Sequence, residues 1–438
     1  MHVQLTKSFT KGLSKFGNNA GLRSVAVYTF SNFFSKGISF ILLFYFARVF
    51  SESDFGMLNL FVNGILFLMP FVSLGILQSA STEFFKKDKK EFSIFFSSTL
   101  VMPVIMAMLI TGLFFIFRHP LQQWYSFPIT FIVLIPLATL FSFLNEHLIN
   151  MIRNSNEPVK YLYVNIGRLL AEIALAVFFI SAYNCGWVGR VTGICISYLM
   201  VAMYAFYYFK QRSFLVKSFQ KKYVYDELQY SVPIIAMQLA IFFMSASGGY
   251  FIKYFTGNYA AVGVFSVAAA LASVIPVLGS ALTQYVYPKI YGMLSQPRVN
   301  YNGICRLFVF YTGAMLLFTI AIISCLPLVY HVALKPSYSE GLSYCYLICI
   351  GYFFWSVTYF FYAFMLYHKQ KRKILFASAL SIIVSVSMHL LFTKKFGAYG
   401  AALSICGTYL LVLIATTIIV YKQLLPVFKN FTANRNHP

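Results

Sequence analysis

Charged residues are scarce in this sequence, and acidic residues are the scarcest. Asp, Glu, Lys and Arg together make up 10% of the 438 residues, and only 11 residues are Asp or Glu. Soluble domains typically carry about 25% charged residues, so this composition excludes an ordinary soluble fold. Hydrophobic residues instead reach 60% of the chain. The sequence therefore predicts an all-α membrane protein that crosses the bilayer many times.

Catalytic and metal-binding motifs are also lacking. The sequence contains no HExxH, no GxSxG and no Gly-rich phosphate loop, so it predicts neither an enzyme nor a metal or other cofactor. The seven cysteines include no CxxC pair and lie mostly in apolar stretches. We expect them to pack as small apolar residues rather than to form disulfides or bind metal.

The apolar stretches are long enough to cross a membrane. About 20 apolar residues span a bilayer as a helix. Twelve stretches meet this criterion, and every loop predicted to face outward is short, which excludes a soluble domain there. The predicted spans cover roughly residues 25–47, 57–79, 93–117, 127–151, 160–181, 187–209, 229–254, 261–288, 303–327, 342–366, 374–393 and 399–421.

Basic residues predict the orientation of the chain. Of the 34 Lys and Arg residues, 25 lie at the two termini and in alternate loops, and two, Lys36 and Arg168, lie inside spans. The seven in the opposite loops are Arg48, Arg118, Arg190, Lys253, Lys335, Lys394 and Lys395. The basic side is expected to be cytoplasmic, with both termini there. The net charge of +23 then indicates contact with anionic lipid rather than with nucleic acid. The first 24 residues are a candidate for a basic amphipathic segment, with Lys7, Lys11, Lys15 and Arg23.

Two halves of six spans each are predicted. The longest cytoplasmic connection, 210–228, divides the chain into residues 1–220 and 221–438. Gly186, Gly189 and Gly193 in the sixth span have counterparts in Gly397, Gly400 and Ser404 in the twelfth. An even number of spans in each half predicts a parallel repeat, related by an axis along the membrane normal.

Lys36 lies at the middle of the first span. An ammonium at that depth costs roughly 2.5–3.5 kcal/mol on insertion scales. Such charges are tolerated when they face a polar cavity. Asn32 precedes Lys36 by one helical turn on the same face. We therefore expect the first helix to line a polar cavity that binds substrate.

Other polar residues extend this candidate site. Arg168 and Glu172 are four residues apart in the fifth span, so they can pair on one helix face. That pair either takes part in function or only fixes helix packing. Glu146, near the end of the fourth span, is either a coupling carboxylate or an interfacial one. The remaining substrate-binding candidates are two asparagines that share a face of the second span and two cations at similar offsets in the halves: Asn59, Asn63, Arg48 and Lys253.

One segment carries a family resemblance. The runs Glu52-Ser-Asp-Phe-Gly-Met-Leu-Asn-Leu, Phe67-Leu-Met-Pro-Phe-Val-Ser-Leu-Gly and Glu83-Phe-Phe-Lys-Lys-Asp-Lys-Lys follow one another. They resemble the opening of Wzx-type polysaccharide-unit flippases in the multidrug/oligosaccharidyl-lipid/polysaccharide exporter superfamily. The resemblance is strongest over residues 24–92, and the layout of twelve spans in two lobes extends it to the whole chain.

The resemblance implies a MATE-like V-shaped bundle in the bacterial inner membrane. Its expected activity is the transfer of undecaprenyl-diphosphate-linked oligosaccharides to the outer face for O-antigen or capsule synthesis. Expected partners are the lipid-linked oligosaccharide, the bilayer, a polysaccharide polymerase and chain-length proteins. Relatives carry cations in a central cavity, as Lys36 and Arg168 would here, but the second half has no matching mid-span cation.

Two alternatives remain open at this stage. A multidrug antiporter of the same superfamily would need intramembrane carboxylates in excess over basic groups to bind organic cations, and here the two kinds balance. A membrane glycosyltransferase or polymerase would need a large outward-facing region, which this sequence lacks. The sequence predicts neither the sugar, the coupling ion nor the oligomeric state.

Overall fold

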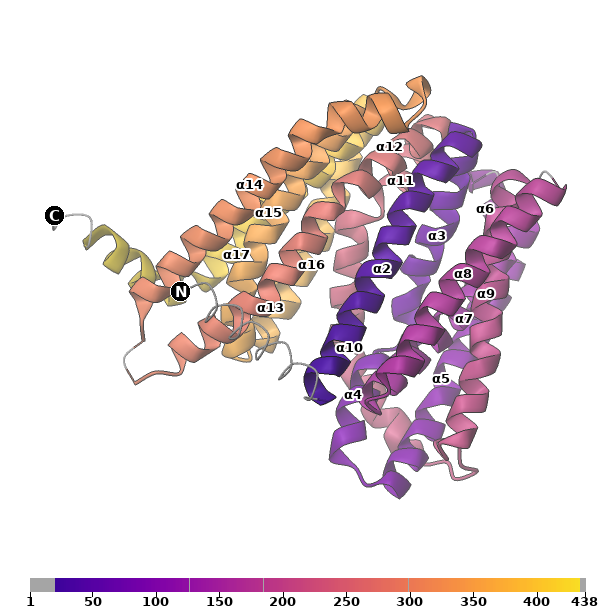
Figure 1. Ribbon diagram of the computed structural model, residues 1–438, viewed down its shortest axis with the longest axis horizontal. Helices are drawn as coiled ribbons and strands as arrows, with labels where there is room; N and C mark the ends of the chain where they lie inside the picture. The colour runs from indigo at the N-terminus through magenta and orange to yellow at the C-terminus, as the bar shows by residue number, and fades with distance from the viewer. Residues whose placement is uncertain (1–19, 126, 184, 298, 434–438) are drawn as a thin grey trace, which may run out of the picture. The chain divides into compact units, whose positions relative to one another are not determined.

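The structure is a computed structural model that describes residues 20–433 except 126, 184 and 298 (Figure 1). The predicted basic segment at the start of the chain lies largely outside these residues. All regular structure in the described part is helical, which confirms the predicted all-α class. By their packing the residues form two compact units.

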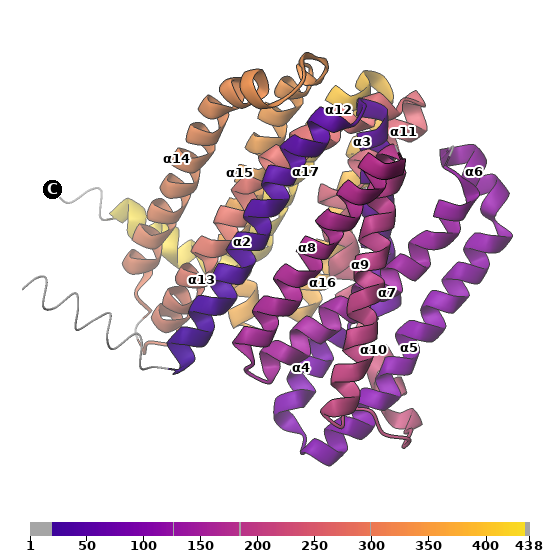
Figure 2. The ribbon, with the colours of Figure 1, turned by 45° about the vertical axis from the view of Figure 1, so that its right-hand side comes forward.

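The first unit contains the described residues up to Leu43 together with Gly64–Val232. Its helix α9 packs against both α7 and α8, and α7 also packs against α5. Figures 1 and 2 show these helices side by side. The helices of this unit are α2 (Ala20–Val49, as far as Leu43), the second half of α3 (Glu52–Ser73), α4 (Ile76–Lys86), α5 (Lys89–Ile116), α6 (Arg118–Tyr125), α7 (Ile129–Asn154), α8 (Pro158–Tyr183), α9 (Gly186–Gln211) and the start of α10 (Lys221–Ser245).

The second unit contains Phe44–Asn63 and the described residues from Pro233 onward. Its central helix is α15, which packs against α12, α13, α14 and α17. Besides parts of α2, α3 and α10, its elements are α11 (Gly248–Thr256), α12 (Tyr259–Ala272), α13 (Val274–Leu294), α14 (Tyr301–Ala333), a 3₁₀ turn (Pro336–Tyr338), α15 (Gly341–Tyr367), α16 (Lys371–Met388), a π-turn (His389–Thr393) and α17 (Lys394–Ala433). The sequence-based division at residue 220 stays a prediction.

The helices match the predicted spans in number. Ten helices or helix runs in the described part are long and apolar enough to cross a membrane, and the bent α10 is an eleventh. The 51-residue run Lys371–Tyr421 is interrupted at Gly397, whose φ of 58° and ψ of −132° are not helical. This interruption makes the run two helices, so twelve spans result.

Several spans are broken where the sequence suggested one smooth helix. The predicted span 229–254 is divided between α10 and α11, and α10 itself bends by 46° after Gln229. Pro233 explains the bend, because a proline has no N–H to donate and clashes with the carbonyl four residues earlier. The predicted loops 80–92 and 118–126 are also partly helical, as α4 and α6.

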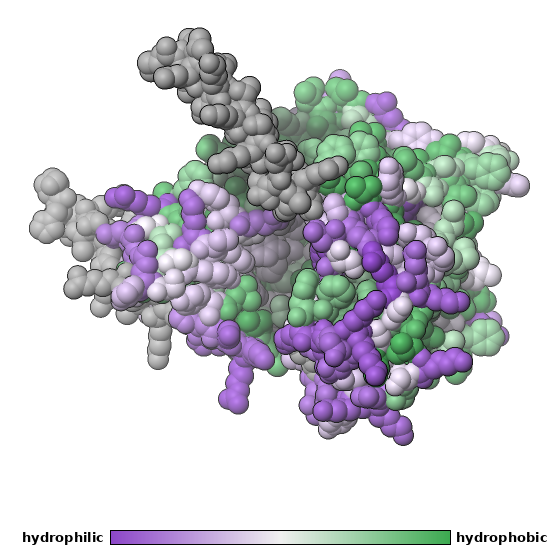
Figure 3. Space-filling view, turned by 60° about the horizontal axis from the view of Figure 1, so that its bottom comes forward, coloured by the Kyte–Doolittle hydropathy of each residue, from purple (hydrophilic) through white to green (hydrophobic). Residues whose placement is uncertain are grey.

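The loops that carry most basic residues in the first unit meet at one end of it. The loop after α9 lies on the start of α5, where the Ser93 hydroxyl donates to the Ser213 carbonyl at 2.8 Å. Arg212 pairs there with Glu157, which also pairs with Lys160 at 2.8 Å. Figure 3 shows hydrophilic side chains gathered at the end of the molecule where these loops lie. This gathering is the pattern that the basic-loop rule requires of a cytoplasmic face.

We expect reporter fusions to reveal which face this is. Five Lys and Arg residues lie between 210 and 222, and none lies in 254–260. A cytoplasm-active reporter fused after Gln220 and a periplasm-active reporter fused after Gly257 should therefore both give signal. Silence of either fusion, with the protein detected in the membrane, would reverse the predicted orientation.

Glycines allow close approach of the backbones at two helix crossings. In the second unit, a Cβ added to Gly56 on α3 would overlap the Tyr259 carbonyl oxygen, and one added to Gly263 on α12 would overlap the Glu52 carbonyl oxygen. In the first unit, a Cβ on Gly193 of α9 would lie 2.9 Å from the Ala176 nitrogen of α8. Small residues permit such close backbone approach between membrane helices. The glycine of the Glu52–Gly56 motif is therefore required by packing.

We expect Gly56→Ala to lower stability by about 1–3 kcal/mol or more, because the new methyl group overlaps backbone that side-chain rotation cannot clear. The measurement is the amount of protein in the membrane together with thermal unfolding in detergent. The matched control is Gly37→Ala, since a Cβ on Gly37 meets nothing within 4 Å. Equal stability of the two variants would show that the α3–α12 crossing is looser than described.

Candidate functional site

A stripe of polar residues runs along α8 in the first unit. Tyr161, Asn165, Arg168 and Glu172 are spaced by four, three and four residues. This spacing places all four side chains on one face of the helix. The face contacts α2 at one end of the stripe and α9 at the other. A polar stripe of this length inside a bilayer-spanning helix requires partners or water.

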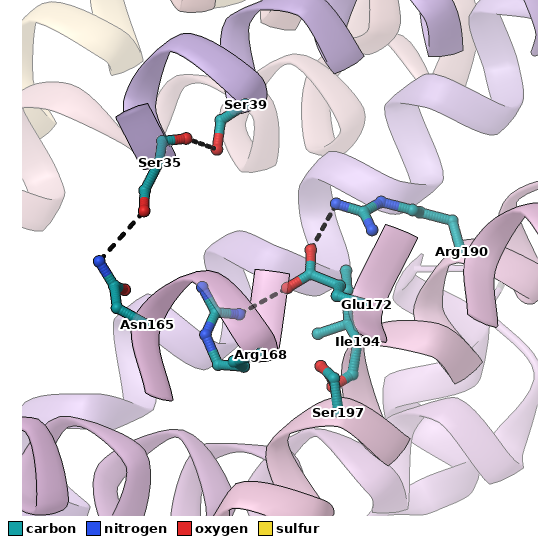
Figure 4. A network of polar contacts seen from close by, with 8 residues as sticks. All are labelled: Ser35, Ser39, Asn165, Arg168, Glu172, Arg190, Ile194 and Ser197. Atoms are coloured by element: carbon teal, nitrogen blue, oxygen red, sulfur yellow. Dashed lines mark hydrogen bonds and ion pairs between the residues drawn. The ribbon is translucent and has the colours of Figure 1, made fainter. Parts of the chain in front are cut away.

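Two residues of the stripe bind α2. The Tyr161 hydroxyl donates to Oδ1 of Asn32 at 2.7 Å. Nδ2 of Asn165 lies 3.0 Å from the Ser31 hydroxyl and 3.1 Å from the Ser35 hydroxyl, and donates to both. Figure 4 shows the contact between Asn165 and Ser35. Asn32 therefore contacts the polar stripe of α8, and its contact with substrate stays a prediction.

Glu172 is held between two arginines. Its Oε2 is 2.5 Å from NH1 of Arg168, so the predicted pair is present. Its Oε1 is 2.5 Å from NH2 of Arg190 on α9. The two guanidinium groups reach the carboxylate from different sides, as Figure 4 shows. The side chains are only 8% (Glu172), 12% (Arg190) and 16% (Arg168) exposed. One negative and two positive groups leave this triad with a net charge of +1.

Arg190 is absent from the predicted site because the sequence pattern assigns it to an outward loop. That interpretation is wrong, since α9 begins at Gly186 and Arg190 is already helical. The signal was available, because the predicted span 187–209 includes this residue. Glycines also bring α9 close to α8 near Glu172: a Cβ on Gly193 would lie 3.1 Å from the Glu172 carbonyl oxygen. This close contact brings Arg190 within reach of the carboxylate.

Further charged and aromatic groups surround the triad. The Arg168 guanidinium lies over the ring of Tyr198, 5.2 Å from its centroid. Glu146 on α7 is exposed and is attracted electrostatically by Arg168 and Arg153. With the triad these groups make three arginines against two glutamates. The cluster therefore keeps a positive excess although it contains both predicted acidic residues.

Lys36 adds a cation beside this cluster. It follows Ser35, which binds Asn165, and lies one turn after Asn32. Its side chain is exposed, and within the described ranges no salt bridge or hydrogen bond to Lys36 is found. Glu172, the carboxylate of the triad, is already shared by two arginines. Lys36 is thus available to an external anion.

Two other predicted residues pair in the second unit. Nδ2 of Asn63 donates to Oδ1 of Asn59 at 2.8 Å and to the Ala246 carbonyl at 3.1 Å. The shared face of these asparagines is therefore confirmed. Ala246 lies between α10 and α11, where the helix is interrupted. Asn63 of this pair thus supplies a hydrogen bond to a backbone carbonyl at the helix interruption.

Arg48 and Lys253 bind helix ends, also in the second unit. Arg48 donates to the carbonyls of Val332 and Ala333 at 2.5 and 3.0 Å, at the end of α14. Lys253 donates to the Gly257 carbonyl at 2.8 Å. Cations stabilise helix C-termini, where carbonyls lack partners. Substrate contact by either residue stays a prediction.

The fold and the cluster together define a multi-pass membrane protein with a net-positive polar site in its first unit. The model of the family described as "Polysaccharide biosynthesis protein" matches residues 22–294. This match covers more than half of the chain, so the protein belongs to that family. No curated protein matches the sequence significantly.

Solved transporters share the fold. An inward-facing multidrug resistance MATE family transporter of the MOP superfamily has a TM-score of 0.69 and 14% identity, over 88% of this chain and 95% of that one. The lipid II flippase MurJ, in an inward closed conformation, has a TM-score of 0.69 and 13% identity, over 93% of both chains. The MATE multidrug transporter DinF-BH has a TM-score of 0.61 and 16% identity, over 92% and 96%. At these identities the likeness establishes the fold, and the predicted MATE-like architecture is confirmed.

Proposed function

We propose that the protein is a flippase for lipid-linked oligosaccharides, which it moves from the cytoplasmic to the outer face of a bacterial inner membrane by alternating access. The observation that carries the proposal is the net-positive polar cluster of α2, α8 and α9. Membership in the polysaccharide biosynthesis family and the fold shared with a lipid II flippase support it.

The proposed substrate is an oligosaccharide on undecaprenyl diphosphate. A diphosphate cannot enter hydrocarbon unaided, since burying an unpaired charge costs many kcal/mol. Exposed Lys36 and the triad offer it fixed cations, and the hydroxyl and amide groups of Asn32, Tyr161 and Asn165 suit a hydrated sugar. The products would serve O-antigen or capsule synthesis, beside a polymerase and chain-length proteins.

A drug transporter is the competing function, because two of the structures with this fold are multidrug transporters. Organic cations would require a carboxylate free to bind them. Glu172 is bound by two arginines and is not free in this way. The charge balance of the cluster therefore favours an anionic substrate.

The proposal is tested with purified protein in proteoliposomes. Fluorescent undecaprenyl-diphosphate oligosaccharide is placed in both leaflets, and a membrane-impermeant quencher reports the fraction that reaches the outside. We expect full quenching with the protein and about half without it. Protein that leaves the lipid in place but carries an organic cation across the same membrane would instead be a drug transporter.

A further inference from the structure

Arg168 and Arg190 hold Glu172 in unequal ways. Arg190 sits on α9 where that helix is pressed against α8, and a Cβ on Gly189 would lie 3.1 Å from the Ile180 nitrogen. Arg190 also makes a further interaction besides its ion pair. The backbones of the two helices are in close contact there. The pair of Glu172 with Arg190 is therefore the fixed side of the triad.

Arg168 is the arginine whose ion pair with Glu172 can break. A guanidinium has five N–H donors, and one ion pair, to Glu172, is found for Arg168 in the described structure. Its side chain is the most exposed of the three. It also stands on the polar stripe one turn after Asn165, the residue that binds α2. Its remaining donors are thus available to a ligand at the site proposed above.

We propose that Glu172 is an internal competitor for the substrate's phosphate: Arg168 exchanges this carboxylate for a phosphate oxygen, while Arg190 retains Glu172. The inference rests on the proposed function and adds a mechanism of release to it. A buried carboxylate that lost its only cation would be strongly destabilised. With two arginines on Glu172, the exchange leaves each negative group with a positive partner.

The same arrangement lets the site release its ligand. A phosphate held bidentately by an arginine is bound tightly, and a transporter must let it go after each cycle. Glu172 stays within reach of Arg168 because Arg190 keeps it there, so the carboxylate can return and displace the phosphate. In this scheme Arg190 is a positioning residue, since it acts on the ligand only through Glu172.

The test measures binding and transport separately in full-length protein. Undecaprenyl diphosphate is titrated into purified protein in nanodiscs, and turnover is measured in the proteoliposome assay. Glu172→Gln, which removes the competitor, should bind the diphosphate about tenfold more tightly or better, yet turn over more slowly. Arg190→Gln should bind about tenfold more weakly, because Glu172 then depends on Arg168 alone. The double variant Glu172→Gln, Arg190→Gln should bind the diphosphate at least as tightly as wild type.

The outcomes separate this inference from the proposed function. Wild-type protein that does not bind the diphosphate would overturn both. Binding that is lost in Arg168→Gln but not tightened by Glu172→Gln would overturn the exchange and leave the flippase intact. If Glu172→Gln does not fold, the Arg190→Lys variant provides the test. It keeps the positive charge but lacks the planar guanidinium group, so its affinity for the diphosphate should fall between those of wild type and Arg190→Gln. If folded Arg190→Lys and Arg190→Gln proteins bind the diphosphate with equal affinity, the exchange is also excluded.

Discussion

Lys36→Ala protein should reach the membrane at the wild-type level and display no surface polysaccharide. The side chain is exposed, and the described structure shows no ion pair or hydrogen bond that its removal would break. Truncation therefore leaves packing unchanged while it removes a cation from beside the polar cluster. Loss of one charge-assisted contact to phosphate is expected to cost about 1.5–3 kcal/mol, or at least a tenfold drop in transport.

Two further variants at this position separate charge from shape. Lys36→Arg keeps the charge but binds phosphate as a planar fork, so it should retain part of the activity. Lys36→Glu should abolish display by repelling the diphosphate. The readouts are surface polysaccharide and membrane protein level in a strain that lacks the native gene. Lys86→Ala is the control, because Lys86 is a lysine with a 66% exposed side chain at the end of α4, in a segment predicted to be cytoplasmic. Normal display by Lys36→Ala protein would remove this residue from the mechanism.

The spans and the pairs within one helix could be predicted because both depend on local sequence. Hydropathy over about 20 residues suffices for a span, and the helical period alone brings Arg168 next to Glu172 and Asn59 next to Asn63. The helix breaks were less predictable. A proline in an apolar stretch does not reveal whether the helix merely bends, as at Pro233, or begins anew, as α13 does just before Pro276.

Contacts between helices could not be predicted from the sequence. Arg190 binds Glu172 across 18 residues, and Arg48 binds Val332 across 284. The sequence pattern assigns both arginines to loops, because a charge at the edge of an apolar stretch is usually exposed. Their partners depend on which helices pack together. Glycines such as Gly193 permit close packing because they have no side chain. Lys394 and Lys395, also assigned to an outward loop, lie just before the interruption at Gly397, where that loop was predicted.

Glu172→Ala should be the most destabilising single change in the triad. It leaves the guanidinium groups of Arg168 and Arg190, at 16% and 12% exposure, without the carboxylate that neutralises them. Removing one partner of a buried ion pair typically costs ~3–5 kcal/mol. Arg168→Ala should cost less, because Arg190 still neutralises Glu172. The Arg168→Ala, Glu172→Ala double variant should lose less than the sum of the two single changes, since the groups contact each other.

Thermal unfolding of the purified variants in detergent measures these differences. The matched control is Glu83→Ala, which removes a carboxylate 3.5 Å from Lys87 and 3.7 Å from Lys86 on α4, outside the predicted spans. Solvent screens that group, so its loss should cost at most about 1 kcal/mol. Additive losses for Arg168 and Glu172, or a Glu172→Ala protein as stable as the Glu83→Ala control, would mean that the triad does not hold α8 and α9 together. The order Glu172→Ala, then Arg168→Ala, then Glu83→Ala is the result expected if one buried carboxylate joins the two helices.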